Sequence, residues 1–332
     1  MAKLGAGLVS PNPMVGAVIV HNNIIIGEGY HQLYGGAHAE VNAINSVTDK
    51  SLLAHSTIYV SLEPCSHFGK TPPCADLIIQ HKIPHVVIAT LDTNKTVCGN
   101  GVSKLKNAGI KVEIGVLENE SNQLNKAFNK LQSKKRPFVI LKWAETADGF
   151  MDHHRTEEKP NALKISNSTS STWVHKLRSE TDAILVGKTT VLKDNPTLNT
   201  RKWAGKNPLR VVIDPHLETI NHDLKIYDQS IPTLVFNSLK SSTENNIQFI
   251  KVTTGETFLT ELLDHLGQLN IQSILVEGGA ITLQKFINAN LYDECYIIKS
   301  TANINSGIDA PKMKSSKYSI FNLGTDIVLK YQ

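Results

Sequence analysis

Four residues in the first quarter of the sequence have the types and the spacing of a hydrolytic metal site. One residue separates His38 from Glu40, and eight residues separate Cys65 from Cys74. One imidazole and two thiolates are a common ligand set for catalytic zinc, which keeps a fourth position for water. A carboxylate that is not a ligand can then carry protons between that water and a substrate. We therefore predict that His38, Cys65 and Cys74 bind about one zinc ion per chain, with Glu40 as the general acid–base.

The order of these residues indicates which reaction the metal serves. A histidine two residues before a glutamate, followed later by Pro-Cys and a second cysteine, is the signature of zinc deaminases, although their usual gap between the cysteines is two residues rather than eight. Two less specific interpretations stay open. One is a structural zinc site with His31 or His67 as a fourth ligand, and the other is burial of both cysteines without a metal. For Cys98 and Cys295 we expect ordinary packing.

Short strands and helices must position these residues. Residues 16–21 and 24–30 predict two strands of a hairpin, and a short helix should begin near His38. A strand over residues 57–62 and a helix that begins after Pro73 would then bring both cysteines to the same edge of the sheet. The alternation of strands and helices predicts a mixed sheet with covering helices.

The length and the middle of the chain predict two domains. The 332 residues exceed one ordinary core, and a polar, lysine-rich stretch over residues 119–135 ends at Arg136-Pro137. We therefore predict domains at residues 1–133 and 137–332. The second domain should also be α/β, with strands at 138–143, 183–187, 209–214, 233–237 and 273–279 and helices at 171–178, 258–269 and 282–290.

Composition excludes several classes of protein. No apolar run approaches the roughly 20 residues of a membrane span, the N-terminus lacks a secretory pattern, and the 4 cysteines are too few for a disulfide scaffold. Basic residues do not cluster with aromatic ones, which make up 6% of the chain, and this argues against a nucleic-acid partner. We predict a cytoplasmic enzyme that acts on a small molecule, forms a homo-oligomer and has no membrane partner.

Two longer strings make the sequence similar to a known family. Residues 63–74 (Glu-Pro-Cys-Ser-His-Phe-Gly-Lys-Thr-Pro-Pro-Cys) and residues 11–16 (Pro-Asn-Pro-Met-Val-Gly) resemble the bifunctional riboflavin-biosynthesis deaminase–reductases. The resemblance implies a cytidine-deaminase-like, three-layer α/β domain in the first half. It also implies zinc-dependent deamination of 2,5-diamino-6-ribosylamino-4(3H)-pyrimidinone 5′-phosphate, a phosphorylated pyrimidine. Its substrate contacts would be Asn12, His67 and Lys70.

The resemblance continues through the second half, at Lys142 and over residues 174–178, 190–196, 210–214 and 275–279. It implies a dihydrofolate-reductase-like fold and NADPH-dependent reduction of the ribosyl group to a ribityl group. The sequence does not decide between NADPH and NADH. At the matching positions, the implied NADPH contacts are Thr190, Asp194 and Gly279, and the implied substrate contacts are Arg178, Leu198, Arg201 and Glu277.

One segment of the second half departs from the family pattern. Ala162 and Lys164 stand where the family often has serine and tryptophan. An alternative is therefore an active deaminase joined to a reductase-like domain that is inactive or only binds ligand. A third interpretation, a zinc-stabilised nucleic-acid-binding module or an RNA-editing deaminase, is disfavoured by the composition.

Overall fold

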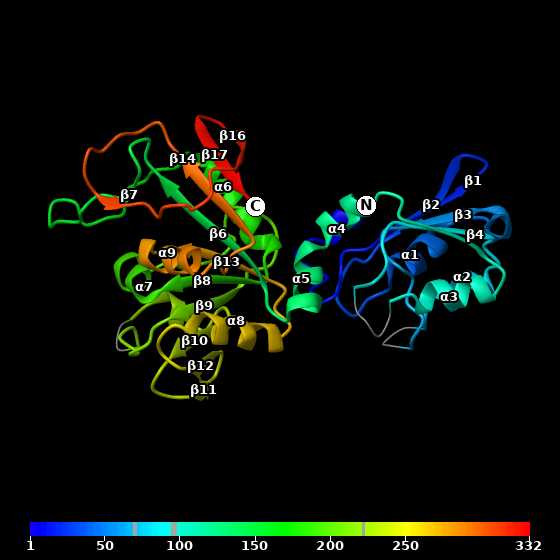
Figure 1. The fold of residues 1–332 in the computed structure, drawn as a ribbon, viewed down its shortest axis with the longest axis horizontal. Coiled ribbons are helices and arrows are strands. Elements are labelled where there is room, and N and C mark those ends of the chain that lie inside the picture. Colours follow the sequence, from blue (N-terminus) through cyan, green and yellow to red (C-terminus); the bar gives the residue numbers. More distant parts are fainter. Residues whose placement is uncertain (69–71, 94–97, 221–222) are drawn as a thin grey trace. The chain divides into compact units, whose positions relative to one another are not determined.

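The computed structural model describes residues 1–68, 72–93, 98–220 and 223–332, which form two compact units (Figure 1). Unit 1 comprises Met1–Lys135 and unit 2 comprises Arg136–Gln332. Lys70, which the family resemblance implies as a substrate contact, lies outside the described residues.

Unit 1 is built on a five-stranded mixed sheet in the order β2-β1-β3-β4-β5. Its strands are β1 (Gly16–His21), β2 (Ile24–Tyr30), β3 (Thr57–Val60), β4 (His85–Ile88) and β5 (Lys111–Ile114). Strand β1, next to the edge strand β2, is antiparallel to both neighbours, whereas β3, β4 and β5 are parallel to one another. Asn22 and Asn23 have φ values of 50° and 63°, as a two-residue hairpin turn requires. The predicted hairpin is confirmed.

Helices follow the strands of unit 1, and two of them begin at metal-site residues. These helices are α1 (Ala39–Ser46), α2 (Cys74–Gln80) and α3 (Asn100–Asn107), with 3-10 turns at Ala2–Gly5 and Lys50–His55. His38 is the N-cap of α1 and has an extended backbone, with ψ of 164°. Cys74 is the first residue of α2. Both ligand positions therefore lie at helix starts, as predicted.

The polar stretch before the boundary forms two helices, α4 (Glu118–Leu124) and α5 (Lys126–Lys134). Asn125 lies between them, with φ of −102° and ψ of 23°, and its side chain binds Met14. Its Oδ1 accepts the Met14 N–H at 2.8 Å, and its Nδ2 donates to the Met14 carbonyl at 2.9 Å. These two hydrogen bonds hold the loop before β1, which contains Asn12, against the start of α5.

Unit 2 contains a ten-stranded sheet in the order β11-β12-β10-β9-β8-β13-β6-β14-β17-β16. The strands that concern the site are β6 (Phe138–Glu145), β8 (Ala183–Gly187), β9 (Leu209–Ile213) and β13 (Ser273–Gly278). The others are β10 (Thr233–Asn237), β11 (Ser242–Glu244), β12 (Ile247–Lys251), β14 (Glu294–Lys299), β16 (Ser319–Leu323) and β17 (Asp326–Tyr331). A separate pair is formed by β7 (Phe150–Asp152) and β15 (Ile308–Asp309).

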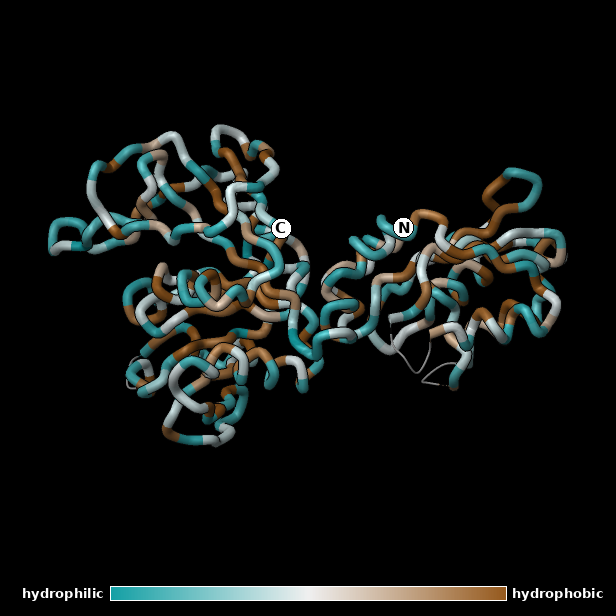
Figure 2. The backbone as a smooth tube through the Cα atoms, viewed as in Figure 1, coloured by the Kyte–Doolittle hydropathy of each residue, from teal (hydrophilic) through white to brown (hydrophobic). Residues whose placement is uncertain are grey.

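The centre of this sheet is parallel and buried. Every pairing from β12 across to β14 is parallel, and antiparallel strands occur at both edges. All residues of β8 and β10 are buried, which explains their continuous apolar runs. Figure 2 shows hydrophobic residues along these central strands. The parallel arrangement places the carboxyl ends of neighbouring strands at one edge, where ligands bind in such sheets.

Helices connect the parallel strands of unit 2. They are α6 (Ser168–Glu180), α7 (Lys188–Asp194), α8 (Phe258–Gln268) and α9 (Ala280–Asn288), with a 3-10 turn at Lys225–Tyr227. The buried residues of α8 have helical spacing at Leu259, Leu262, Leu263 and Leu266, so one face of this helix packs on the core.

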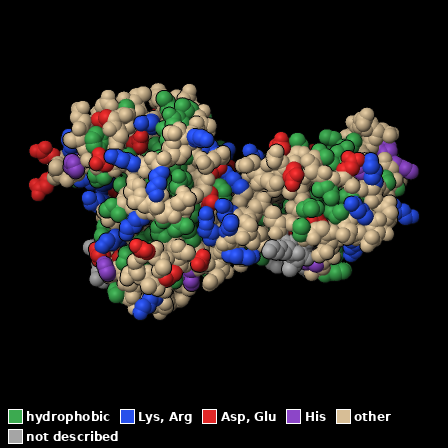
Figure 3. All heavy atoms as spheres, in the orientation of Figure 1, with side chains coloured by type: hydrophobic (Ala, Val, Ile, Leu, Met, Phe, Trp, Pro, Cys, Tyr) green, Lys and Arg blue, Asp and Glu red, His purple; other side chains and the backbone are tan. Residues whose placement is uncertain are grey.

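On the face drawn in Figure 3, basic and acidic side chains are interspersed. Within the residues that the structure describes, no helix combines the length and the apolar character of a membrane span.

Candidate active sites

Three predicted ligand residues converge in unit 1. The His38 Nδ1 atom lies 3.5 Å from Cys65 Sγ and 3.3 Å from Cys74 Sγ. All three ligand atoms lie within 4.8 Å of one another. Zinc bonds of about 2.1 Å to nitrogen and about 2.3 Å to sulfur put those atoms about 3.5 Å apart in a tetrahedral site, so the trio has the size that zinc requires.

The two thiols shift each other's pKa in opposite directions. A hydrogen bond from Cys74 lowers the pKa of the Cys65 thiol, and His38 acts in the same direction although burial opposes it. The pKa of Cys74 is raised because its thiol donates that hydrogen bond and is buried. A metal that binds both sulfurs favours the thiolate form of each. The donor set therefore fits a divalent cation.

Glu40 follows His38 in the first turn of α1 and is only 3% exposed. Burial raises the pKa of its carboxyl group to about 7. A hydrogen bond from the backbone N–H of Glu40 itself has the opposite effect and lowers this pKa. The charge on Cys65 raises this pKa further, and His38 lowers it. A carboxyl group whose pKa lies near neutrality can accept a proton and return it within one reaction cycle.

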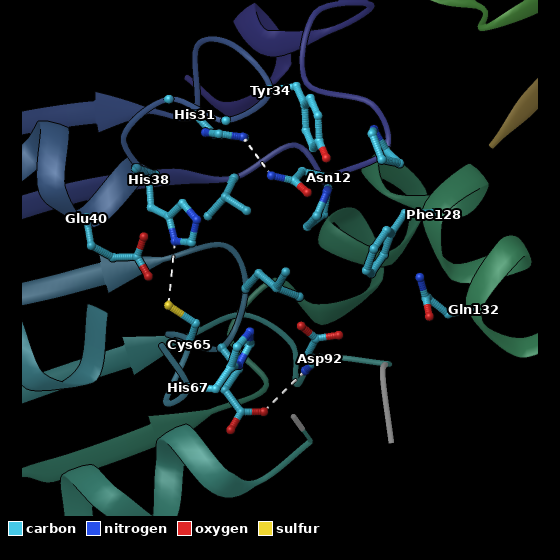
Figure 4. Close-up of a pocket in the computed structure, with 18 residues that line it drawn as sticks. Asn12, His31, Tyr34, His38, Glu40, Cys65, His67, Asp92, Phe128 and Gln132 are labelled. Atoms are coloured by element: carbon cyan, nitrogen blue, oxygen red, sulfur yellow. Dashed lines mark hydrogen bonds between the residues drawn. The ribbon is translucent and has the colours of Figure 1, made fainter. Parts of the chain in front are cut away.

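A cavity of about 380 Å³ opens beside these residues (Figure 4). Asn12 and His67 line it together with His38, Glu40 and Cys65, so the two described substrate contacts implied for the first half lie at one site. His67 is exposed at the cavity.

The amide of Asn12 is held in one orientation. Its Nδ2 lies 3.2 Å from His31 Nε2, and His31 Nδ1 lies 3.0 Å from the Ala37 carbonyl. If Nδ1 carries the imidazole proton and donates it to that carbonyl, Nε2 accepts from Asn12. Burial lowers the pKa of His31, which favours this neutral imidazole. Both ring nitrogens are therefore engaged, and His31 lies outside the three-residue metal group of the described chain.

The other side of the cavity comes from a part of the chain that the motifs did not indicate. Phe128 and Gln132 of α5 line the cavity together with Tyr34 and Asp92. Figure 4 shows Phe128 and Gln132 across the cavity from Glu40. Their approach depends on long-range packing, so no spacing in the sequence predicted it.

Glu63, which precedes Pro64 and Cys65, has a structural role. Its carboxylate accepts the backbone N–H groups of Gly99 at 2.9 Å, Val102 at 3.2 Å and Asp92 at 3.3 Å. These bonds fix the turn before α3 beneath the cysteine loop.

In unit 2, Arg178 of α6 and Glu277 of β13 form a bidentate ion pair. Arg178 Nε donates to Glu277 Oε1 at 2.8 Å, and Nη2 donates to Oε2 at 2.6 Å. The third donor, Nη1, binds the Asn199 carbonyl at 3.0 Å. Burial alone would raise the pKa of Glu277, but the charges of Arg178 and Lys142 lower it to about 2. Glu277 is therefore a fixed anion at neutral pH.

Two further titratable residues belong to this cluster. Lys142 lies on β6, and because Leu141 pairs with Val276, the register places it beside Glu277. Burial lowers the pKa of Lys142, while Glu277 raises it. His175 lies one turn before Arg178 on α6, and burial followed by the charges of Arg178 and Arg201 lowers its pKa to about 4. Lys142 and His175 both stood in the family resemblance, and neither had an assigned role there.

The Gly-rich turn after β13 lies against α7. The Thr190 Oγ1 atom is 3.2 Å from the position that a Cβ on Gly279 would occupy. Thr190 and Gly279, both implied as NADPH contacts, are thus brought together. Gly279 is also the N-cap of α9, and helix N-termini bind phosphate groups. Gly187 ends β8, and a Cβ there would lie 2.5 Å from Thr282 Oγ1, so only glycine permits this close packing of α9.

The remaining implied contacts of unit 2 lie in different environments. Asp194 forms an ion pair with Arg155, whose Nε also binds Asp152 at 2.9 Å. Arg201 is exposed and donates to Asn199 Oδ1 at 3.0 Å. The Leu198 side chain is 3% exposed and packs in a hydrophobic cluster, so only its backbone is available to a ligand.

The segment around Ala162 and Lys164, which differs from the family pattern, is anchored through its backbone. The Leu163 N–H donates to Asp152 Oδ1 at 2.8 Å, whereas Ala162 and Lys164 are exposed. The altered side chains therefore do not support the fold around them.

Two family models match the chain. The cytidine and deoxycytidylate deaminase zinc-binding region matches residues 2–90, and the RibD C-terminal domain matches residues 137–300. Riboflavin biosynthesis protein RibD from Aquifex aeolicus is 36% identical over 345 residues, which cover 100% of this chain and 95% of that protein. The chain belongs to the RibD family.

Other RibD proteins agree in sequence and in structure. RibD from Actinobacillus pleuropneumoniae is 38% identical over 90% of this chain and 80% of its own length. The crystal structure of a diaminohydroxyphosphoribosylaminopyrimidine deaminase/5-amino-6-(5-phosphoribosylamino)uracil reductase from Thermotoga maritima has a TM-score of 0.88 and 37% identity, covering 99% of this chain and 94% of that one. Acinetobacter baumannii RibD has a TM-score of 0.85 and 29% identity, with the same coverage.

Membership of the RibD family establishes the activities of the protein. It is a bifunctional deaminase and reductase of riboflavin biosynthesis, with a cytidine-deaminase-like N-terminal domain and a dihydrofolate-reductase-like C-terminal domain. The zinc-binding region and the RibD reductase domain imply zinc and NADPH as cofactors. Its substrates are small phosphorylated pyrimidines.

Proposed function

We propose that the cavity of unit 1 is the deaminase site and that it acts on diaminohydroxyphosphoribosylaminopyrimidine, the compound in the name of the Thermotoga maritima enzyme. The convergence of His38, Cys65 and Cys74 beside a cavity that also contains a buried carboxyl group is the observation that carries this proposal. These three residues hold zinc, and His31 and His67 do not.

When bound, zinc supplies a water that loses a proton near neutral pH. Glu40 would accept that proton, because its carboxyl group lies in the first turn of α1, two residues from His38, and lines the cavity. It then returns protons to the ring nitrogen and to the departing amine. Asn12, oriented by His31, binds the polar edge of the pyrimidine. His67 and Lys70 stay proposed substrate contacts at the cysteine loop.

We also propose that the reductase site lies at the carboxyl ends of β8 and β13. NADPH supplies a hydride there. Thr190 and the Gly279 turn approach each other closely enough to hold the cofactor phosphate, and Asp194 lies at the end of the same helix as Thr190. Arg178, Arg201, Glu277 and the backbone of Leu198 bind the substrate. Because Glu277 fixes the guanidinium of Arg178, its first role is to position that side chain.

The division of the chain into Met1–Lys135 and Arg136–Gln332 supports domain limits near the proposed residues 1–133 and 137–332. We further propose that the enzyme works as a homo-oligomer in the cytoplasm, where its small phosphorylated substrates would be found, without a nucleic-acid or membrane partner.

A coupled assay with metal analysis tests both site assignments. Purified protein is incubated with the diaminopyrimidine phosphate, with and without NADPH. We expect ammonia release in both samples, ribityl product and NADPH oxidation in the second, and about one zinc per chain. Deamination without any NADPH oxidation would instead support the single-activity alternative. The double substitution Ala162→Ser with Lys164→Trp would then test whether the altered residues 162 and 164 cause the loss of NADPH oxidation.

A further inference from the structure

His175 has a buried nitrogen that lacks a partner. The residue is 3% exposed, and within the described part of the chain its Nδ1 atom makes no hydrogen bond. Leaving a buried polar atom unpaired destabilises a fold, and such atoms in native structures often face a ligand or an ordered water.

The surroundings of His175 indicate what kind of ligand is missing. The loop after α7 binds α6 on both sides of it: the Asn199 carbonyl accepts from Arg178 one turn later, and Lys202 Nζ donates to Ser171 Oγ one turn earlier at 2.8 Å. His175 is thus enclosed between α6 and residues 199–202.

Positive charge exceeds negative charge around this imidazole. Arg178, Arg201 and Lys202 all act on it electrostatically, and Glu277 is the acidic residue among its principal neighbours. Both oxygens of Glu277 are already bound to Arg178. The side chains of Arg201 and Lys202 are exposed at the loop. A ligand with two negative charges would balance this excess, and a carboxylate would balance only part of it.

We propose that His175 binds the phosphate group of the reductase substrate through Nδ1, between Arg201 and Lys202. This inference rests on the proposed reductase site of unit 2. The lowered pKa of His175 agrees with it, because the neutral imidazole can donate one hydrogen bond to a phosphate oxygen without adding a further charge to a cationic site. The residue is a binding residue, and no proton transfer is assigned to it.

Three substitutions distinguish the contribution of Nδ1 to ligand binding from that of Nε2. His175→Asn keeps an amide near the position of Nδ1, His175→Gln keeps one near Nε2, and His175→Phe keeps the ring shape without either nitrogen. NADPH oxidation is followed with the deaminated substrate, with and without its phosphate. We expect His175→Phe and His175→Gln to raise KM about tenfold for the phosphorylated substrate alone, and His175→Asn to raise it little.

Calorimetric titration of the full chain with ribose 5-phosphate, and with ribose as control, measures the same contact without turnover. Ribose 5-phosphate should bind about tenfold more weakly to His175→Phe than to His175→Asn. Deamination and the thermal midpoint report whether each variant is folded, and if His175→Phe is not, the Asn and Gln variants still give the comparison.

The proposal would be overturned if the variants lost equal affinity for phosphorylated and unphosphorylated ligands. It would also be overturned if His175→Gln kept the affinity for ribose 5-phosphate and His175→Asn did not. Unchanged binding in all three variants would show that Nδ1 faces a structural water instead. If the unmodified enzyme binds ribose 5-phosphate through His175 but oxidises no NADPH, the proposed reductase activity fails and this inference stands.

Discussion

Each candidate site contains a glutamate with a shifted pKa, and the two carboxyl groups, of Glu40 and Glu277, have opposite properties. Burial raises the pKa of Glu40 to about 7. Glu277 is largely enclosed, with a side chain 9% exposed, yet the charges of Arg178 and Lys142 lower its pKa to about 2. The charged neighbours decide the result: Glu40 lies beside the Cys65 sulfur and one histidine, whereas Glu277 binds a guanidinium with both oxygens.

This contrast shows how one residue type serves two purposes. A carboxyl group that titrates near neutrality can move protons, so Glu40 suits hydrolysis. A carboxylate locked in a bidentate pair cannot release its charge, so Glu277 suits orientation of Arg178 for an anionic substrate. Neither role follows from burial alone.

The strongest test removes the cation that the first site requires. Cys65→Ser or Cys74→Ser leaves two of the three protein ligands, so we expect loss of zinc and of deamination. NADPH oxidation with authentic deaminated substrate should persist, because unit 2 has its own core. Metal analysis and both assays measure this. Full zinc retention in both variants would remove the ligand assignment.

Glu40→Gln tests the proton-moving half of the comparison. The amide cannot accept a proton, so deamination should fall about 10² to 10⁴-fold while zinc content stays unchanged. Because burial favours the neutral form of Glu40, its replacement by a neutral amide should change the unfolding free energy of unit 1 little. Near-normal turnover in this variant would assign the proton transfer to another group, with His67 the first candidate at the cavity.

Glu277→Gln tests the other side of this comparison, the role of Glu277 as a permanently charged carboxylate. It leaves the buried charges of Arg178 and Lys142 without their counter-charge, so the unfolding free energy of unit 2 should fall by about 3 kcal/mol. Reduction should weaken through a higher KM, while deamination is unaffected. Urea unfolding and the two assays follow these effects. A variant as stable as the unmodified protein would show that the ion pair contributes no more than its neutral replacement.

The smallest effect concerns acid stability. The folded pKa of Glu277 lies below its value in an unfolded chain, so the unfolded state binds more protons and stability falls as pH falls from about 5 toward 2. Between pH 5 and 3.5 this carboxyl should account for about 1 kcal/mol of the loss. In urea unfolding at these two pH values, the unfolding free energy of Glu277→Gln should therefore decrease by correspondingly less than that of the unmodified protein. Identical losses would mean that Glu277 has an ordinary pKa.

The sequence by itself predicted the three residues that converge in unit 1 and most of the elements that hold them. His38, Glu40 and Cys74 lie at helix starts and Cys65 lies in the loop after β3, and the hairpin and the buried strands of unit 2 follow from local apolar patterns. Local sequence is sufficient for these features because a helix start or a strand depends on residues a few positions apart.

Only the tertiary structure decided which residues complete the sites. Asn125, between α4 and α5, binds Met14, which is distant in sequence, and α5 supplies Phe128 and Gln132 to the cavity. The pairing of β6 with β13 brings Lys142 beside Glu277, and the loop after α7 encloses His175. Strand order and packing create these neighbours over long sequence separations, and the charges that result set the pKa of each buried group.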